Sequence, residues 1–364
     1  MGGGLLQLVA YGAQDVYLTG NPQITFFKVV YRRHTNFSIE SIQQTFNGSA
    51  EQGKRVTCQI SRNGDLVHKL YVVFTKGSFE GDSRDLIEKV EIEIGGQLID
   101  RQYGHWMKIW NELTLPAGKK VGYEKMTKSA TNKLYLPLEF WFCRNVGLAL
   151  PLIALQYHEV KINIEFAPLT GNSFTDAELW ADYIFLDTDE RRRFAQLSHE
   201  YLIEQVQFTG SESVGNGDSS KSIKLSFNHP VKELIWQRNN ARTNEDQPYN
   251  TTGKAKLMLN GNDRFAERDD MYFTHVQPYQ HHTNIPDSSK YINVYSFALK
   301  PEEHQPSGTL NMSRIDTAQL KLDWGTGANN QVAATDTTGE IKIYAHSYNV
   351  LRILSGMGGL AYSN

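Results

Sequence analysis

The stretch VTCQISRNGDLVHKLYVVF, residues 56–74, decides the fold, because the second half of the chain repeats its pattern. Its counterpart is KSIKLSFNHPVKELIWQR, residues 221–238. In both stretches, apolar and polar residues alternate on either side of a short turn region that contains Asn, which predicts a strand, a turn and a second strand. We therefore expect residues 56–74 to form a β-hairpin that superposes on residues 221–238.

Three more pairs of segments follow in the same order along the two halves of the chain. The pairs are residues 90–107 with 255–273, 137–166 with 295–324, and 179–194 with 341–356. Identity within the pairs is slight, but the order of the elements is kept throughout. A repeat of this kind marks a duplicated structural unit, so we interpret the chain as two copies of one all-β unit.

Each copy contains about eight short strands with long cross-connections, which is typical of a jelly-roll sandwich. The sequence therefore predicts an all-β fold: a double jelly roll, two eight-stranded antiparallel β-sandwiches in tandem, with an N-terminal arm and few short helices. The expected domains are the arm at residues 1–36, the first jelly roll at 37–195, and the second jelly roll with a C-terminal tail at 196–364. One helix is expected at residues 103–113, where apolar residues recur at helical spacing: Trp106, Ile109, Trp110 and Leu113.

The charge balance gives no general electrostatic attraction for nucleic acid. Lys and Arg total 37 against 40 Asp and Glu, for a net charge of −3, so we expect no direct binding of nucleic acid. The longest apolar run, residues 146–155, is broken by Pro151 and is far too short to span a membrane. No signal peptide is expected at the N-terminus, which lacks a basic n-region.

The two cysteines, Cys58 and Cys143, fall in expected strands, where we interpret them as small buried apolar residues. Two cysteines make neither a disulfide framework nor a zinc site. Their number fits folding in a reducing compartment.

A jelly roll can hold a catalytic metal, which would need two or three histidines and a carboxylate converging inside the barrel. The only adjacent pair is His281-His282, in a stretch rich in Gln, Thr and Pro. Neighbouring residues on a strand point to opposite faces, so we interpret the pair as part of an exposed polar loop and expect no metal site.

Paired carboxylates for glycoside hydrolysis are the other catalytic candidate, at Asp187, Asp189 and Glu190. They adjoin three arginines at residues 191–193, so a local charge network near the boundary between the two copies is the preferred interpretation. The sequence contains no Gly-rich phosphate loop followed by a helix and no nucleophile elbow. We therefore predict that the protein is not an enzyme and has no catalytic residues, bound cofactor or metal.

Residues 1–36 resemble neither copy of the repeat. A terminal arm of this kind has no core of its own and must lie on another surface. Its apolar and aromatic residues cannot all be buried by so short a segment, which makes them candidate assembly residues. The candidates are Tyr11, Val16, Tyr17, Phe26 and Phe27.

Four long stretches of the chain carry a family resemblance. They are GGGLLQLVAYGAQDVYLTGNPQITFFKVVYRRHTNFSIESIQQTFNG at residues 2–48, YIFLDTDERRRFAQLSHEYLIEQVQFTG at 183–210, LNGNDRFAERDDMYFTHVQPYQ at 259–280, and YNVLRILSGMGGLAYSN at 348–364. Together with shorter stretches between them, they resemble the major capsid protein of large icosahedral nucleocytoplasmic double-stranded DNA viruses, most closely the algal phycodnavirus branch. The resemblance is collinear over nearly the whole chain.

This resemblance implies a double jelly roll whose homotrimers form capsomers of pseudo-sixfold outline and tile the capsid of a virion assembled in the host cytoplasm. It also implies contacts with neighbouring capsomers, with minor capsid proteins and, through the arm, with an internal viral membrane. The chain looks shorter than typical members in loops that form outward towers and carry glycans in relatives, such as 76–83, 239–253 and 325–339. The chain has four glycosylation sequons, and without a signal peptide the secretory machinery is expected to leave them unmodified. Asn250 lies on the most loop-like stretch and is the candidate glycosylation site if a glycan is present.

Two alternatives stay open from the sequence: a minor capsid protein of the same fold, and a carbohydrate-binding jelly-roll module. The second would use exposed aromatic side chains to stack on sugars. Trp180, Trp236 and Trp324 lie in expected strands, so packing in the core or between the jelly rolls is the preferred interpretation. A stable trimer favours the capsomer, whereas a monomer that binds glycans favours the lectin.

Overall fold

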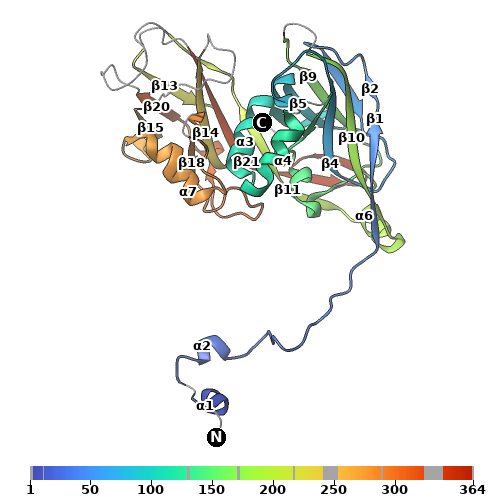
Figure 1. The fold of residues 1–364 in the computed structure, drawn as a ribbon, viewed down its shortest axis with the longest axis vertical. Coiled ribbons are helices and arrows are strands. Elements are labelled where there is room, and N and C mark those ends of the chain that lie inside the picture. Colours follow the sequence, from blue (N-terminus) through green and yellow to red (C-terminus); the bar gives the residue numbers. More distant parts are fainter. Residues whose placement is uncertain are drawn as a thin grey trace. The chain divides into compact units, whose positions relative to one another are not determined.

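Four antiparallel sheets, arranged as two sandwiches, make up the body of the protein (Figure 1). The computed structural model describes residues 3–10, 12–128, 132–169, 173–215, 218–240, 253–287, 290–323 and 339–362. The chain divides into two compact units, Met1–Asn36 and Phe37–Asn364. We describe each unit by itself.

The N-terminal unit contains two short helices, α1 (Gly3–Val9) and α2 (Val16–Thr19), followed by an extended stretch. Neither helix has a buried residue. Asn21, just after α2, has a positive φ of 52°, a conformation that Asn adopts more readily than most residues and that suits the turn expected there. The unit therefore has no hydrophobic core among its described residues.

The first jelly roll has its strands in two sheets, ordered β1-β10-β4-β7 and β2-β3-β9-β5-β6, with β8 paired to β4. Its strands are β1 (Phe37–Gln44), β2 (Phe46–Asn47), β3 (Arg55–Gln59), β4 (Leu66–Lys76), β5 (Ile87–Ile94), β6 (Gln97–Tyr103), β7 (Lys133–Pro137), β8 (Leu150–Pro151), β9 (Val160–Phe166) and β10 (Phe174–Leu186). Its helices are η1 (Ser83–Leu86), α3 (Gly104–Thr114), α4 (Ala117–Thr127), α5 (Trp141–Arg144), η2 (Val146–Leu148) and α6 (Thr188–Gln196).

The second jelly roll has sheets ordered β11-β21-β14-β18 and β13-β20-β15-β16. Four short strands pair with interior strands of these sheets: β12 and β22 with β21, β19 with β14, and β17 with β15. Its strands are β11 (His199–Phe208), β12 (Glu212–Val214), β13 (Ser220–Leu225), β14 (Pro230–Asn240), β15 (Lys254–Leu259), β16 (Asn262–Asp263), β17 (Arg268–Asp269), β18 (Asn293–Ser296), β19 (Leu310–Asn311), β20 (Ala318–Asp323), β21 (Gly339–Leu354) and β22 (Met357–Leu360). Its helices are the π-helix η3 (Tyr272–Val276), α7 (Gln277–His281), which continues it, and η5 (Met312–Arg314).

The two sandwiches have the same topology. When the eight main strands of each are counted along the chain, one sheet takes the order first-eighth-third-sixth and the other second-seventh-fourth-fifth, in both copies. A helix follows the fifth strand in both, as α3 in the first and as η3 with α7 in the second. The predicted double jelly roll and the predicted helix at residues 103–113 are therefore confirmed.

The predicted hairpin at residues 56–74 is wrong. Strand β3 pairs with β9 and β2, whereas β4 pairs with β10, β7 and β8, so the two strands lie in opposite sheets. Its counterpart behaves in the same way, because β13 pairs with β20 and β14 with β21. Alternation shows which side of a strand faces the core, but both sheets of a sandwich share that alternation, so it does not identify the partner strand.

The prediction that Cys143 lies in a strand is also wrong, because this residue lies in the short helix α5. The apolar stretch Phe140, Trp141 and Phe142 is buried on successive residues, which a one-sided strand does not allow. Both cysteines are nevertheless buried and free, as expected, and burial raises the pKa of the Cys58 thiol to about 11 and that of Cys143 to about 12.

Candidate assembly surfaces

Helix α3 lies between the two jelly rolls (Figure 1). Its side chains join them through a shared apolar cluster. Its Met107 enters the core of the first jelly roll, while the opposite face of the helix packs on the outer face of the sheet β11-β21-β14-β18. The cluster consists of Trp106, Ile109, Trp110 and Leu113 from α3 with Val206, Ile235, Val294 and Tyr344 from the sheet and Ile292 beside it. Each large apolar side chain buried in this way contributes about 1.5–3 kcal/mol, so the two jelly rolls are held as one body.

A buried ion-pair network lies beside this cluster. Its members are Arg144, Glu204, Lys232, Glu233, His282, Glu302, His304 and His346. Arg144 comes from α5 in the first jelly roll, and its Nη1 donates to Glu204 Oε2 across the boundary at 2.7 Å. The Nζ of Lys232 donates to the other oxygen of Glu204 at 2.9 Å. The guanidinium of Arg144 also lies 4.4 Å from the ring centre of Trp110, which connects the network to the apolar cluster.

Glu233 is the second carboxylate of the network and is fully buried. His282 Nε2 donates to its Oε2 at 2.8 Å, and the ring of His346 lies between Glu233 and Glu204, with contacts of 3.2 and 3.1 Å. A register shift between Val231 and Glu233 marks a β-bulge in β14. The extra residue there is Lys232, so two adjacent charged side chains reach the same buried network.

Mutual pairing determines the ionisation of these groups. Burial would raise the pKa of Glu204, but its contacts with His304 and His346 and the charge of Arg144 hold that pKa well below its usual range. Burial would lower the pKa of His282, but the carboxylates of Glu233 and Glu302 raise it to about 9. Burial lowers the pKa of Lys232, and Glu204 partly offsets this. His282 therefore carries a proton at neutral pH, and both of its N–H groups donate to carboxylates.

The expectation that His281 and His282 form an exposed loop is wrong. His281 is the last residue of helix α7, and the side chain of His282 is fully buried. Within the described part of the chain, no group of three or more His, Cys, Asp and Glu could hold a metal ion. The signal that sequence reasoning missed is the pair Lys232-Glu233, which directly precedes the apolar residues Leu234, Ile235 and Trp236 in a buried strand. Two adjacent charges in a buried strand demand partners nearby.

The candidate carboxylates near the boundary have local roles. Asp187 caps α6 by accepting a hydrogen bond from the Thr188 N–H at 2.7 Å. Glu190 pairs with Arg193 at 3.4 Å, and Arg191 pairs with Asp65 of the first jelly roll at 2.9 Å. These contacts agree with the preferred interpretation of a charge network.

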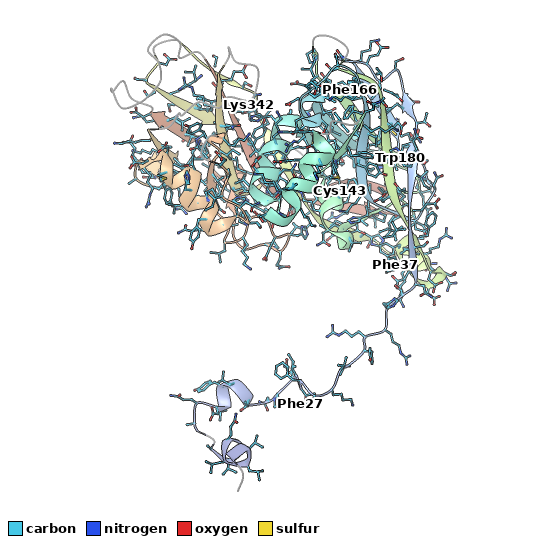
Figure 2. The ribbon with its side chains drawn as sticks, in the orientation of Figure 1. Phe27, Phe37, Cys143, Phe166, Trp180 and Lys342 are labelled. Carbon is cyan, nitrogen blue, oxygen red and sulfur yellow. The ribbon has the colours of Figure 1, made fainter. Side chains whose placement is uncertain are left out.

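The candidate assembly residues of the arm that the structure describes are all exposed. The exposed fractions are 52% for Val16, 91% for Tyr17, 92% for Phe26 and 97% for Phe27, which Figure 2 labels. Tyr11 lies outside the described residues, as do Asn250 and Trp324. Trp236 is buried in the core of the second jelly roll, and Trp180 is half-buried on β10. The assembly role of the arm residues and the glycosylation of Asn250 stay predictions.

No helix in the described ranges has the length and apolarity needed to cross a membrane.

Family comparisons cover both jelly rolls. Residues 25–187 match the family described as the major capsid protein N-terminus, and residues 190–359 match the large eukaryotic DNA virus major capsid protein. The major capsid proteins of Pyramimonas orientalis virus and Paramecium bursaria Chlorella virus 1 are 54% and 47% identical to this chain, over the whole of both chains in each case. The alignment with the Chlorella virus protein spans 439 positions against the 364 residues here, so that relative carries insertions.

Solved structures agree with this result. A chain of the quasi-atomic model of the PBCV-1 virus capsid matches with a TM-score of 0.83 at 42% identity, covering 93% of this chain and 100% of that one. The Faustovirus major capsid protein, only 11% identical, shares the fold with a TM-score of 0.71 over 94% of each chain. The resemblance to the phycodnavirus branch is therefore confirmed. The chain belongs to the major capsid proteins of large eukaryotic DNA viruses and is a structural component of the virion capsid.

Proposed function

We propose that three copies of this chain form a capsomer of pseudo-sixfold outline and that these capsomers tile an icosahedral shell. The observation that supports this most directly is the presence of two jelly rolls of identical topology in one chain, joined by a buried interface. Because each copy supplies two similar bodies, a ring of three copies presents six similar positions. The chain acts through packing and contacts, not through catalysis.

In this proposal the domains are the arm at residues 1–36, the first jelly roll at 37–195 and the second at 196–364. The exposed apolar residues of the arm contact minor capsid proteins and the internal viral membrane, which bury side chains that the arm leaves exposed. Assembly takes place in the host cytoplasm, where free buried thiols such as Cys58 and Cys143 persist. Asn250 is the proposed glycosylation site.

The mass of the purified full chain in solution tests the trimer. Light scattering coupled to size-exclusion chromatography should give three times 41.4 kDa. A glycan-binding monomer would support the carbohydrate-binding alternative and contradict the capsomer. Mass spectrometry of the protein from virions, before and after deglycosylation, tests Asn250: an unmodified peptide containing this residue would overturn that assignment.

A further inference from the structure

The two equivalent sheets β1-β10-β4-β7 and β11-β21-β14-β18 differ on their outer faces. In both sheets, the strands that come third and eighth along the jelly roll pair with a bulge: β4 with β10, and β14 with β21. The extra residue is His68 in the first sheet, next to the pair Lys69 and Asp182, and Lys232 in the second, next to the pair Glu233 and His346. Aligned on these bulges, Tyr71 and Trp180 of the first sheet correspond to Ile235 and Tyr344 of the second. Ile235 and Tyr344 are the residues on which α3 packs.

In the first jelly roll this position is an aromatic stripe that is only partly covered. The rings of Tyr71 and Trp180 stack with centres 6.3 Å apart and planes 5° apart, and Tyr135 lies 6.4 Å from Tyr71. Tyr135 is 42% exposed, and Phe37 and Ile39 on β1 are 62% and 55% exposed. Figure 2 labels Trp180 and Phe37 on this sheet.

The helix that corresponds to α3 is η3 with α7. Met107 of α3 and Phe273 of η3 are both fully buried, each in the core of its own jelly roll. Aligned on these two residues, Trp110 and Leu113 of α3 correspond to Val276 and Tyr279. The first pair is buried between the jelly rolls, whereas Val276 is 37% and Tyr279 76% exposed.

We propose that η3 and α7 of one copy dock on the outer face of β1-β10-β4-β7 in a second copy, as α3 docks on β11-β21-β14-β18 within one chain. Figure 1 shows α7 and β1 on opposite flanks of the body, so a chain cannot make this contact with itself. The contact joins two different surfaces, and such a contact closes into a ring of three when each copy is rotated by one third of a turn from the last. This inference rests on the proposed trimer and names the surfaces that form it.

The chemistry of the two surfaces suits a second copy of the chain. Tyr and Trp are the residues most enriched at the energetic centres of protein interfaces, and the stripe offers Tyr71, Trp180 and Tyr135. The helix offers Tyr279, with Met271 also 61% exposed on the preceding turns. Within one chain, the packing of α3 on the sheet β11-β21-β14-β18 buries the apolar side chains of both. The proposed contact uses the same arrangement of helix on sheet.

Cysteine cross-linking of the full chain tests the contact. The double variant Tyr135→Cys with Tyr279→Cys is treated with a short thiol-reactive cross-linker, and the native Cys58 and Cys143 are buried and give little background. Covalent species of two and three chains are expected, ending at three. The matched control is Tyr135→Cys with Leu354→Cys, because Leu354 at the end of β21 is 56% exposed but belongs neither to η3 and α7 nor to the sheet β1-β10-β4-β7. Neither this control nor either single variant should cross-link.

The outcomes separate this inference from the trimer itself. A protein that elutes as a trimer but cross-links no more than the control would overturn the proposed surfaces and leave the trimer standing. Cross-linking of Tyr279→Cys alone would mean that two identical surfaces meet, which also overturns the inference. A protein that remains a single chain at every concentration would contradict both proposals.

Discussion

Two sheets with the same strand order carry different side chains on their outer faces. The face of β11-β21-β14-β18 is covered by α3 and carries a buried network of ionised side chains, whereas the face of β1-β10-β4-β7 carries partly exposed aromatic rings. At equivalent places beside the bulge, Glu233 is fully buried and Lys69 is exposed. Duplication preserved the strand order, and the side chains on each face differ according to what covers it.

Substitution of charged residues on the two faces should give the largest difference in the free energy of unfolding. Glu233→Ala would leave the protonated His282 without its main partner in a buried site and should destabilise the protein by about 3–5 kcal/mol. Lys69→Ala, at the equivalent exposed place, should change stability by less than about 0.5 kcal/mol. Denaturant unfolding of both variants measures this, and equal effects would contradict the comparison.

The apolar contacts should give the next largest effect. Leu113→Ala removes a fully buried side chain between the jelly rolls and should cost about 2–5 kcal/mol. Tyr279→Ala, the equivalent change on α7, should cost less than about 0.5 kcal/mol in a single chain but should weaken the trimer. Thermal unfolding and solution mass of each variant provide the two readouts. A Tyr279→Ala protein that assembles normally would break the proposed equivalence.

The covered face should also make stability depend on pH. The pKa of His282 is about 9 in the folded protein against about 6.5 in an unfolded chain. The contribution of the protonated His282 ring to the free energy of unfolding is therefore fully present below about pH 6.5 and is lost as pH rises through about 9. Glu233 and Glu302 face the ring, with His346 on the far side of Glu233. Melting temperatures from pH 6 to 10 should fall less in His282→Gln than in the unmodified chain, and parallel curves would contradict this.

The smallest effect on stability is expected from the arm, because its two described helices contain no buried residue. Deleting residues 2–20 should leave the unfolding curve of the two jelly rolls unchanged while impairing shell formation. Electron microscopy of assembled particles tests the second part. Normal shells from the truncated chain would show that the arm is dispensable for assembly.

The sequence predicted what depends on local pattern and missed what depends on distant partners. Trp106, Ile109 and Trp110 at helical spacing identified α3, and the repeated order of strands identified two jelly rolls. Alternation did not show that β3 and β4 belong to opposite sheets. The ion-pair network was missed because its groups come from sites far apart along the chain, such as Arg144, Glu204 and His346, and no local pattern brings them together.

The account depends most on the claim that the exposed stripe becomes covered when copies assemble, as its equivalent is covered within one chain. Hydroxyl-radical footprinting of trimers and single chains, separated by size, measures this directly. We predict that Tyr71, Trp180 and Tyr279 lose reactivity in the trimer, while Tyr344, only 1% exposed, is unreactive in both. A trimer in which Trp180 and Tyr279 react as they do in the single chain would contradict it.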